Sequence, residues 1–408
     1  MIPMGIGREF IRLCGEVGNL SKRVTGLSIV DAYYGPEELA PDRQAENRKS
    51  ETILQDLSVL SDNIKDEIEQ PLRSMYLTTE IHSLQSIVRW MTGEEMSYVE
   101  IVENVFGIKP TRFSENEVQD AMKNVETAFS DCPGSDTRER VEQFRLNGQV
   151  QGEDAKNYIE GELQQRAKDV GILFRKKVYT LMDATVTDNG IEYKAVTGKP
   201  WGGYNYYQGN YRSKNEFNVD RPFSKHGLAA VIYHEYEHHV SNLWREKAYY
   251  DNNWTDLSIV PLTGRCVISE GTADTAMDFL ELGEGTDDSR RMRALTNLSR
   301  MCGMNAALML NHEQASEDDV VWYLVERTFG KEERIRPSLE FSRPKTKDGK
   351  PNLWAPYIFN YLAGRMDFVY PTFVKAKEND MLSDFFKTVY LNPYSGSSRT
   401  WNKAFDWL

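Results

Sequence analysis

The sequence predicts a mainly α-helical, two-lobed protein with a small β-sheet next to a helix that carries an HExxH motif. Three observations predict this fold. Apolar residues recur at three- and four-residue spacing from the start to about residue 180. Strand-like alternation is confined to one segment, and HExxH lies in a later helical pattern. We expect an N-terminal helical lobe over residues 1–180 and a metal-bearing catalytic lobe over residues 181–408.

The N-terminal segment is expected to be an amphipathic helix. Arg8, Arg12 and Glu16 lie among its apolar residues, so it lacks the uninterrupted apolar region of a signal peptide. No stretch approaches the ~18 uninterrupted apolar residues of a membrane-spanning helix. The four cysteines form no CxxC pair, which favours buried thiols over a disulfide framework. We therefore expect a cytoplasmic protein with no membrane partner.

The composition indicates a folded chain and argues against one class of partner. Hydrophobic residues make up 40% of the 408 residues and charged residues 27%, as in ordinary globular proteins. The formal net charge is -13, whereas phosphate contacts need clustered Lys and Arg. We expect no nucleic-acid partner, and the sequence leaves the oligomeric state open.

The one segment with strand character runs from Val186 to Asp220. Its Asn189-Gly190 pair is a turn signal, and apolar residues alternate with polar residues after it. We expect a small sheet here, with Asn215–Asp220 as an exposed edge strand that offers backbone groups to an extended peptide. A plain structural hairpin is the alternative.

The remaining segments are helical with one exception. The expected segments are a helix over Lys225 to Tyr250 with Ser224 as its N-cap, a helix over Cys266 to Leu282 ended by Gly283, a helix to Gly330 begun by a capping box of Ser316 and Asp319, and a surface loop over Lys331 to Pro351.

The helix over Lys225 to Tyr250 carries the motif with the most specific chemistry. His234 and His238 are four residues apart, so a helix places both rings on one face, where they can bind one ion. Glu235 lies beside them and is the candidate base that accepts a proton from a metal-activated water. For six histidines in this chain, roughly 0.01 such motifs are expected by chance. His239 lies on another face and is expected to hydrogen-bond a ligand or to be solvated.

A catalytic zinc ion needs a third protein ligand, and Glu270 is the best candidate. It lies on the next predicted helix. Asp274 follows one turn later, where it could hydrogen-bond a liganding imidazole and fix its tautomer. The small residues Gly271, Ala273 and Ala276 would let the two helices approach closely. The alternative is an ordinary exposed acidic pair. The other histidines, at positions 82, 226 and 312, show no ligand spacing.

HExxH followed by a distant Glu-x-x-x-Asp resembles the gluzincin metallopeptidases, a clan that includes thermolysin and carboxypeptidase Taq. The helical composition is closer to the helical oligopeptidase and carboxypeptidase Taq branch. The resemblance implies zinc, one ion per chain, held by His234, His238 and Glu270, with Glu235 as the base. It also implies that a strand near the metal helix binds substrate.

Several segments are similar to uncharacterised prokaryotic proteins of the DUF885-like type. They are Asp31-Ala-Tyr-Tyr-Gly-Pro36, Tyr207-Gln-Gly-Asn-Tyr-Arg-Ser213, Glu270-Gly-Thr-Ala273 and Tyr357-Ile-Phe-Asn-Tyr-Leu-Ala-Gly364. In those relatives the helix motif is longer, with Tyr-Pro-Gly between HE and two histidines. The compact HExxH spacing of this chain favours the zinc assignment and weakens any transfer of substrate.

Further site candidates follow from the gluzincin resemblance and from side-chain chemistry. In the helical gluzincins a distal tyrosine donates a hydrogen bond to the oxyanion, and Tyr357, followed by Tyr361, is the candidate here. The substrate-binding candidates are Tyr207 and Asn218 near the metal helix, together with Arg212 and Arg365, whose guanidinium groups suit a substrate carboxylate. Either arginine could instead be a structural ion-pair partner.

The predicted function is a zinc metallopeptidase that hydrolyses short peptides with metal-activated water. Two alternatives stay open. A zinc hydrolase could act on a non-peptide amide, because the motif specifies water activation and not the acyl donor. A non-catalytic metal-binding or scaffold protein is the other alternative, although a structural site gains nothing from Glu235.

Overall fold

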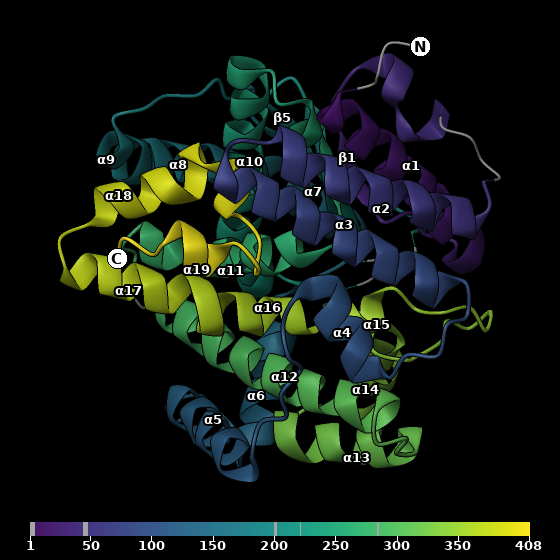
Figure 1. Ribbon diagram of the computed structural model, residues 1–408. Helices are drawn as coiled ribbons and strands as arrows, with labels where there is room; N and C mark the ends of the chain where they lie inside the picture. The colour runs from purple at the N-terminus through teal and green to yellow at the C-terminus, as the bar shows by residue number, and fades with distance from the viewer. Residues whose placement is uncertain (1–4, 44–47, 200–201, 221, 284) are drawn as a thin grey trace.

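Helices make up most of the molecule, and short strands form only small sheets (Figure 1). This computed structural model describes residues 5–43, 48–199, 202–220, 222–283 and 285–408. The predicted mainly α fold with small β-sheets is therefore confirmed.

The N-terminal segment forms an amphipathic helix, as predicted, because its apolar residues share one face. Helix α1 (Ile6–Thr25) buries Phe10, Leu13 and Val17, and it ends at Gly26, whose φ of 86° suits glycine. It packs against α2 (Ser50–Glu67) and α3 (Pro71–Met91), and α3 contacts α4 (Tyr98–Phe106). The expected all-helix region is interrupted by β1 (Val30–Tyr33), which pairs antiparallel with the distant strand β7 (Ile259–Pro261).

The second part of this region is also helical. It comprises α5 (Glu115–Ala128), α6 (Thr137–Asn147), α7 (Gly152–Asn157), α8 (Gln164–Phe174) and α9 (Thr180–Met182). Two π-helical segments, Tyr158–Leu163 and Arg175–Tyr179, join the last three helices into one stretch. A short antiparallel pair, β2 (Gln149–Val150) and β6 (Phe223–Ser224), connects this region to the start of the motif helix.

The predicted small sheet is present, but its strand order differs from the prediction. It consists of β3 (Ile191–Val196), β5 (Arg212–Asn218) and β4 (Gly203–Gly209), in that spatial order. Strand β5 lies in the centre, parallel to β3 and antiparallel to β4, so the expectation that Asn215–Asp220 is an edge strand is wrong. Strand β4 is the edge nearer to the motif residues, and both β4 and β5 contact α10 (Lys225–Asn252).

Two helices in the middle of the molecule pack against each other. Helix α10 begins where predicted, because the Ser224 side chain accepts a hydrogen bond from the Gly227 N–H. Helix α11 (Gly264–Phe279) starts two residues earlier than predicted. It ends before Gly283, because Glu281 already adopts a left-handed φ of 54°. Figure 1 shows α11 between α10 and the C-terminal helices.

The C-terminal part covers the other side of α11. Its helices are α12 (Asp287–Asn311), α13 (Glu317–Thr328), α14 (Glu332–Ser338), α15 (Trp354–Tyr357), α16 (Phe359–Ala363), α17 (Tyr370–Glu378), α18 (Leu382–Phe386) and α19 (Trp401–Ala404), with the π-helical segments η7 (Gly364–Val369) and η8 (Lys387–Leu391). Ser316 caps α13 as predicted. The expected loop over Lys331 to Pro351 is wrong in its first part, which forms α14.

Buried apolar residues form two large clusters. One is built mainly by α1 to α5 with α12 and α13, and the other by residues 155–182 with the sheet and the last helices. Helices α10 and α11 contribute to both clusters. The division into lobes at residue 180 stays a prediction.

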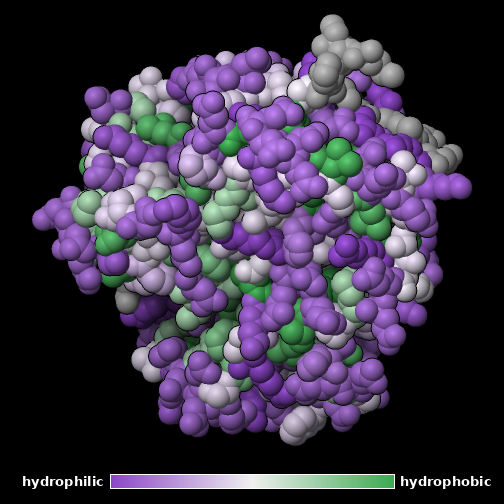
Figure 2. Space-filling model, viewed as in Figure 1, coloured by the Kyte–Doolittle hydropathy of each residue, from purple (hydrophilic) through white to green (hydrophobic). Residues whose placement is uncertain are grey.

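The face seen in Figure 2 is mostly hydrophilic, with hydrophobic residues in small scattered groups. Single exposed apolar side chains of this kind are ordinary on protein surfaces. All four cysteines are free, as the sequence indicated, and three of them are buried, whereas Cys132 is partly exposed. No helix in the described ranges is long and apolar enough to cross a membrane.

Candidate metal centre

Helix α10 places two imidazoles side by side. His234 and His238 are one helical turn apart, and their Nε2 atoms lie 3.1 Å from each other. Both rings are partly exposed, whereas the neighbouring Glu237 and His239 are fully buried. The predicted geometry of the HExxH helix is therefore present.

Helix α11 adds a carboxylate to this pair. Glu270 is 6% exposed, and its Oε2 atom lies 3.3 Å from His234 Nε2 and 3.8 Å from His238 Nε2. This buried oxygen has no hydrogen-bond partner in the described part of the chain. The three residues form a group that could hold a metal ion.

The separations of these atoms suit a tetrahedral ion. Ligands about 2.1 Å from a tetrahedral zinc ion lie about 3.4 Å from one another. The observed separations of 3.1, 3.3 and 3.8 Å bracket that value. Without a cation, Glu270 Oε2 would be a buried carboxylate oxygen with no hydrogen bond, which would destabilise the folded protein. The residues present therefore fit a metal ion.

Each imidazole is oriented by a hydrogen bond at its other nitrogen. His234 Nδ1 lies 2.8 Å from Asp274 Oδ1, as predicted for Asp274, and His238 Nδ1 lies 3.1 Å from Ser269 Oγ. A carboxylate can only accept, so Nδ1 of His234 carries the proton and Nε2 keeps its lone pair for a metal. The Asp274 and Ser269 side chains thus present both rings as ligands.

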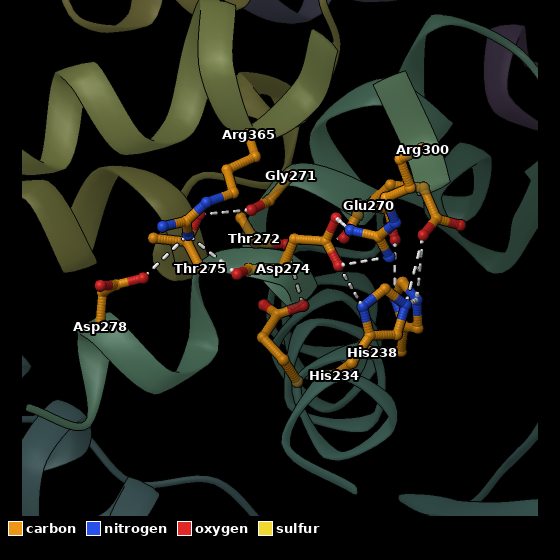
Figure 3. A network of polar contacts seen from close by, with 12 residues as sticks. His234, His238, Glu270, Gly271, Thr272, Asp274, Thr275, Asp278, Arg300 and Arg365 are labelled. Atoms are coloured by element: carbon orange, nitrogen blue, oxygen red, sulfur yellow. Dashed lines mark hydrogen bonds and ion pairs between the residues drawn. The ribbon is translucent and has the colours of Figure 1, made fainter. Parts of the chain in front are cut away.

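A guanidinium group holds Asp274 in place. Arg300 of α12 binds both carboxylate oxygens, with Nη1 on Oδ2 and Nη2 3.0 Å from Oδ1. Figure 3 shows Asp274 between Arg300 and His234. Three helices therefore contribute to a continuous chain of contacts that ends at the ligand nitrogen.

The two candidate tyrosines occupy different positions around Glu270. The Tyr357 hydroxyl is buried and donates to Glu270 Oε1 at 2.6 Å, so it orients the carboxylate. Tyr361 is partly exposed, and its hydroxyl makes no hydrogen bond to another described residue. The Arg300 guanidinium lies over its ring at 5.1 Å. The Tyr361 hydroxyl, unlike that of Tyr357, is therefore not engaged by a described residue.

The imidazoles and carboxylates of the site shift one another's pKa values. Burial alone would lower the pKa of His234, but the adjacent carboxylates of Asp274 and Glu270 raise it well above its ordinary value. Burial and the charge of His234 lower the pKa of His238 to about 4. Without a metal, one proton is thus held on His234 between two carboxylates, and a bound cation would displace it.

The candidate base lies at the junction between α10 and the sheet. Asn205 of the edge strand β4 donates from Nδ2 to Glu235 Oε2 at 3.3 Å. Burial raises the pKa of the Glu235 carboxyl, while His234 and Asn205 act in the opposite direction. A raised pKa brings a carboxylate closer to the range suited to a general base.

Two of the predicted substrate-binding residues have structural partners instead. Tyr207 is 6% exposed, and its hydroxyl donates to Glu246 of α10. Asn218 is 2% exposed and donates from Nδ2 to the Lys199 carbonyl at 2.7 Å. Both side chains are buried, so neither is accessible to a substrate.

The two predicted arginines also lie away from the ligand atoms. Arg365 donates to Asp278 Oδ2 at 2.8 Å and to the Asp274 carbonyl at 2.9 Å, and it stacks on Tyr370. It therefore joins η7 to α11, as Figure 3 shows. Arg212 is exposed at the start of β5.

His239 takes part in a separate buried network. Its Nδ1 atom lies 2.8 Å from Ser213 Oγ and its Nε2 atom 3.1 Å from Asp188 Oδ1. It is fully buried, so the expectation of a solvated or ligand-bonding histidine is wrong. Its two polar contacts attach α10 to the sheet and to the segment before it.

Comparisons with known proteins add information on the fold. No family model matches this chain, and no curated protein matches it. A crystal structure from Colwellia psychrerythraea, provisionally described as a lipoprotein, is similar with a TM-score of 0.55 and 16% sequence identity. The similarity covers 88% of this chain and 70% of that one, and at this identity it shows the fold alone.

Proposed function

We propose that this protein is a zinc-dependent hydrolase that cleaves peptide bonds in short peptides, a metallopeptidase of the gluzincin type. The observation that carries the proposal is the convergence of His234 Nε2, His238 Nε2 and Glu270 Oε2 beside the Glu235 carboxylate.

The donor set favours zinc. Two imidazole nitrogens and one carboxylate oxygen are a ligand set of catalytic zinc, and three protein ligands leave a position open. When bound, such an ion polarises a carbonyl group and lowers the pKa of water. A structural site would instead be closed by a fourth protein ligand.

The surrounding side chains supply the remaining functions. Glu235 accepts a proton from the attacking water and passes it to the leaving amine. Asn205 holds the Glu235 carboxylate in place from β4. The Tyr361 hydroxyl, which no described residue engages, donates to the oxygen that becomes negative as the carbonyl is attacked.

An extended peptide has a place to bind next to these groups. Strand β4 (Gly203–Gly209) is an edge of its sheet, and no other described strand pairs with its outer side, although β1 packs against β4 and the Tyr204 hydroxyl donates to Asp31. Its Asn205 side chain contacts Glu235, so a peptide added along β4 would pass the candidate base. The edge strand that the sequence placed at Asn215–Asp220 is thus β4 instead.

Metal analysis combined with digestion of a peptide library tests the proposal. The purified protein should bind about one zinc ion per chain. Glu235→Gln should keep the metal while hydrolysis falls by at least ~100-fold, because only the proton acceptor is removed. Glu281→Gln, a surface change on α11's C-terminal side, is the matched control and should retain activity.

Two results would contradict the proposal. Metal content that survives the combined loss of His234 and His238 would show that the ion binds elsewhere. A Glu235→Gln variant with the wild-type rate would remove that carboxylate from the mechanism.

A further inference from the structure

A small cavity lies behind the metal-ligand group. It has about 50 Å³ of free space and is bounded by α10, α11 and the segment from η8 to residue 396. Its polar lining consists of Ser241, Arg245, Arg265, Ser269, Thr272 and Tyr390. Two of these six side chains are buried guanidinium groups, so the cavity is lined by two positive charges.

Arg265 makes fewer hydrogen bonds than Arg245. It is 9% exposed and makes one hydrogen bond among the described residues, from Nη2 to Asn242 Oδ1 at 3.3 Å. No described carboxylate lies within ion-pair distance of it. A guanidinium has five N–H donors, so most of those on Arg265 lack a protein acceptor. Arg265 also belongs to the first turn of α11, where the helix dipole favours an anion.

Arg245 adds a second charge to the same cavity. It is 4% exposed and donates from Nε to the Leu257 carbonyl at 2.9 Å and from Nη2 to the Ile259 carbonyl at 3.2 Å. Its Nη1 makes no hydrogen bond within the described ranges, and its charge also lacks a paired carboxylate there. Buried charges of this kind are normally paired.

Ser269 connects the cavity to the metal ligands. His238 Nδ1 donates to Ser269 Oγ when its Nε2 atom is free to bind a metal. The Ser269 hydroxyl hydrogen must then point elsewhere, and no acceptor for it is found among the described residues. The cavity is the space that Ser269 lines on that side, so a third donor is available there.

The nearby carboxylates of Glu237 and Glu80 do not pair with the two arginines. Glu237 accepts the hydroxyls of Ser241 at 2.6 Å, Thr272 at 2.9 Å and Tyr390 at 3.1 Å. Glu80 accepts the Thr263 hydroxyl on Oε2, its Oε1 has no hydrogen-bond partner among the described residues, and it approaches neither cavity arginine within ion-pair distance. Neither carboxylate therefore takes the place of a ligand for the two guanidinium groups.

We propose that this cavity binds a small inorganic anion of the size of chloride, and that the anion strengthens His238 as a metal ligand. About 50 Å³ holds a few water-sized particles and excludes a peptide. An anion that accepts the Ser269 O–H bond makes Ser269 Oγ a better acceptor for His238 Nδ1–H, which raises the electron density at Nε2. This second part rests on the proposed metal site, whereas anion binding does not.

Thermal unfolding of the metal-free protein tests anion binding alone. Replacing gluconate, which is too large for the cavity, with 100 mM chloride at constant ionic strength should raise Tm by about 1–2 °C. Arg265→Gln should abolish the increase. Arg138→Gln removes the same charge from an arginine outside the cavity, which binds two backbone carbonyls, and it should keep the increase.

Bromide can show directly where the anion binds. Anomalous scattering from bromide-soaked crystals should place one ion between Arg245 and Arg265, even if Arg265→Gln does not fold. Water alone in the cavity at high bromide, or equal chloride stabilisation of the wild type and Arg265→Gln, would overturn the proposal.

Zinc affinity tests the coupling. Competition with a chromophoric chelator should give about 3- to 10-fold tighter zinc binding in chloride than in gluconate, a coupling in the usual range. Ser269→Ala should remove this difference while chloride still raises Tm. Equal zinc affinities in the two salts would overturn the coupling. A protein that binds chloride but no zinc would refute the proposed function and leave the anion site standing.

Discussion

Two hydroxyl groups near Glu270 have the same chemistry and different surroundings. Tyr357 is buried and donates to Glu270 Oε1 at 2.6 Å, whereas the Tyr361 hydroxyl has no partner among the described residues. A donor that is already bonded to a ligand carboxylate cannot follow charge that develops on a substrate. Loss of the Tyr357 hydroxyl should therefore weaken metal binding, and loss of the Tyr361 hydroxyl should slow turnover.

Replacing each tyrosine with phenylalanine separates these roles. Tyr361→Phe should lower kcat by ~100-fold or more, the usual loss for one oxyanion donor, with zinc affinity unchanged. Tyr357→Phe should weaken zinc binding by about 10- to 100-fold, because it removes a hydrogen bond that orients a ligand. Steady-state kinetics and chelator competition measure the two effects. The reverse pattern would restore Tyr357 as the substrate donor.

The residues that sequence analysis found are those with a local pattern. His234, Glu235 and His238 follow from helix periodicity, and Asp274 follows from its spacing of four from Glu270. Ser269, Arg300 and Asn205 were missed because their roles depend on contacts between residues 26 to 31 positions apart in the sequence. Ser269 stands next to Glu270, but nothing in its spacing indicates that it faces an imidazole.

At the scale of elements, α11 is held against η7 by a contact between two glycines. A Cβ atom on Gly364 would lie 1.9 Å from the Val267 carbonyl oxygen, and one on Gly271 would lie 2.4 Å from the Gly364 backbone. The sequence predicted that Gly271 lets the two metal helices approach. The structure shows instead that it admits the C-terminal segment, which lies against the helix that carries Glu270 and Asp274.

Gly364→Ala should therefore separate these two segments. We expect a loss of about 2–4 kcal/mol in the free energy of unfolding, because backbone atoms must move to make room. Urea denaturation measures the loss. Gly303→Ala in α12 is the matched control, since its Cβ would meet only Ile358 Cδ1 at 3.5 Å and alanine favours the helix. A Gly364→Ala variant within about 1 kcal/mol of the wild type would contradict the close approach.

Helix positions were more predictable than strand order. Helix α10 could be predicted because Ser224 and the apolar spacing act within one segment. The central position of β5 depends on pairing with both β3 and β4, and alternation alone does not distinguish a central strand from an edge. Helix α14 contains Pro337, and its charged, proline-containing sequence gave no helical pattern.

At the scale of the whole molecule, the candidate ligands lie on the two helices that join its hydrophobic clusters. Helix α10 contributes Ala248 to one cluster and Trp244 to the other, and α11 contributes Val267 and Ile268 in the same way. An ion bound by His234, His238 and Glu270 would cross-link these helices. Its binding free energy would therefore stabilise the whole fold and not only the site.

Lowering the free zinc concentration should lower the unfolding midpoint of the entire chain. The change in stability should follow the logarithm of that concentration. At a free zinc concentration 1,000 times Kd the stabilisation is about 4 kcal/mol. Calorimetry in zinc buffers measures it. The His234→Ala, His238→Ala double variant should be insensitive to zinc, whereas His312→Ala, which changes an exposed histidine outside the site, should behave like the wild type. Equal stabilisation of the double variant would show that zinc binds to other groups and that α10 and α11 are held together by their packing alone.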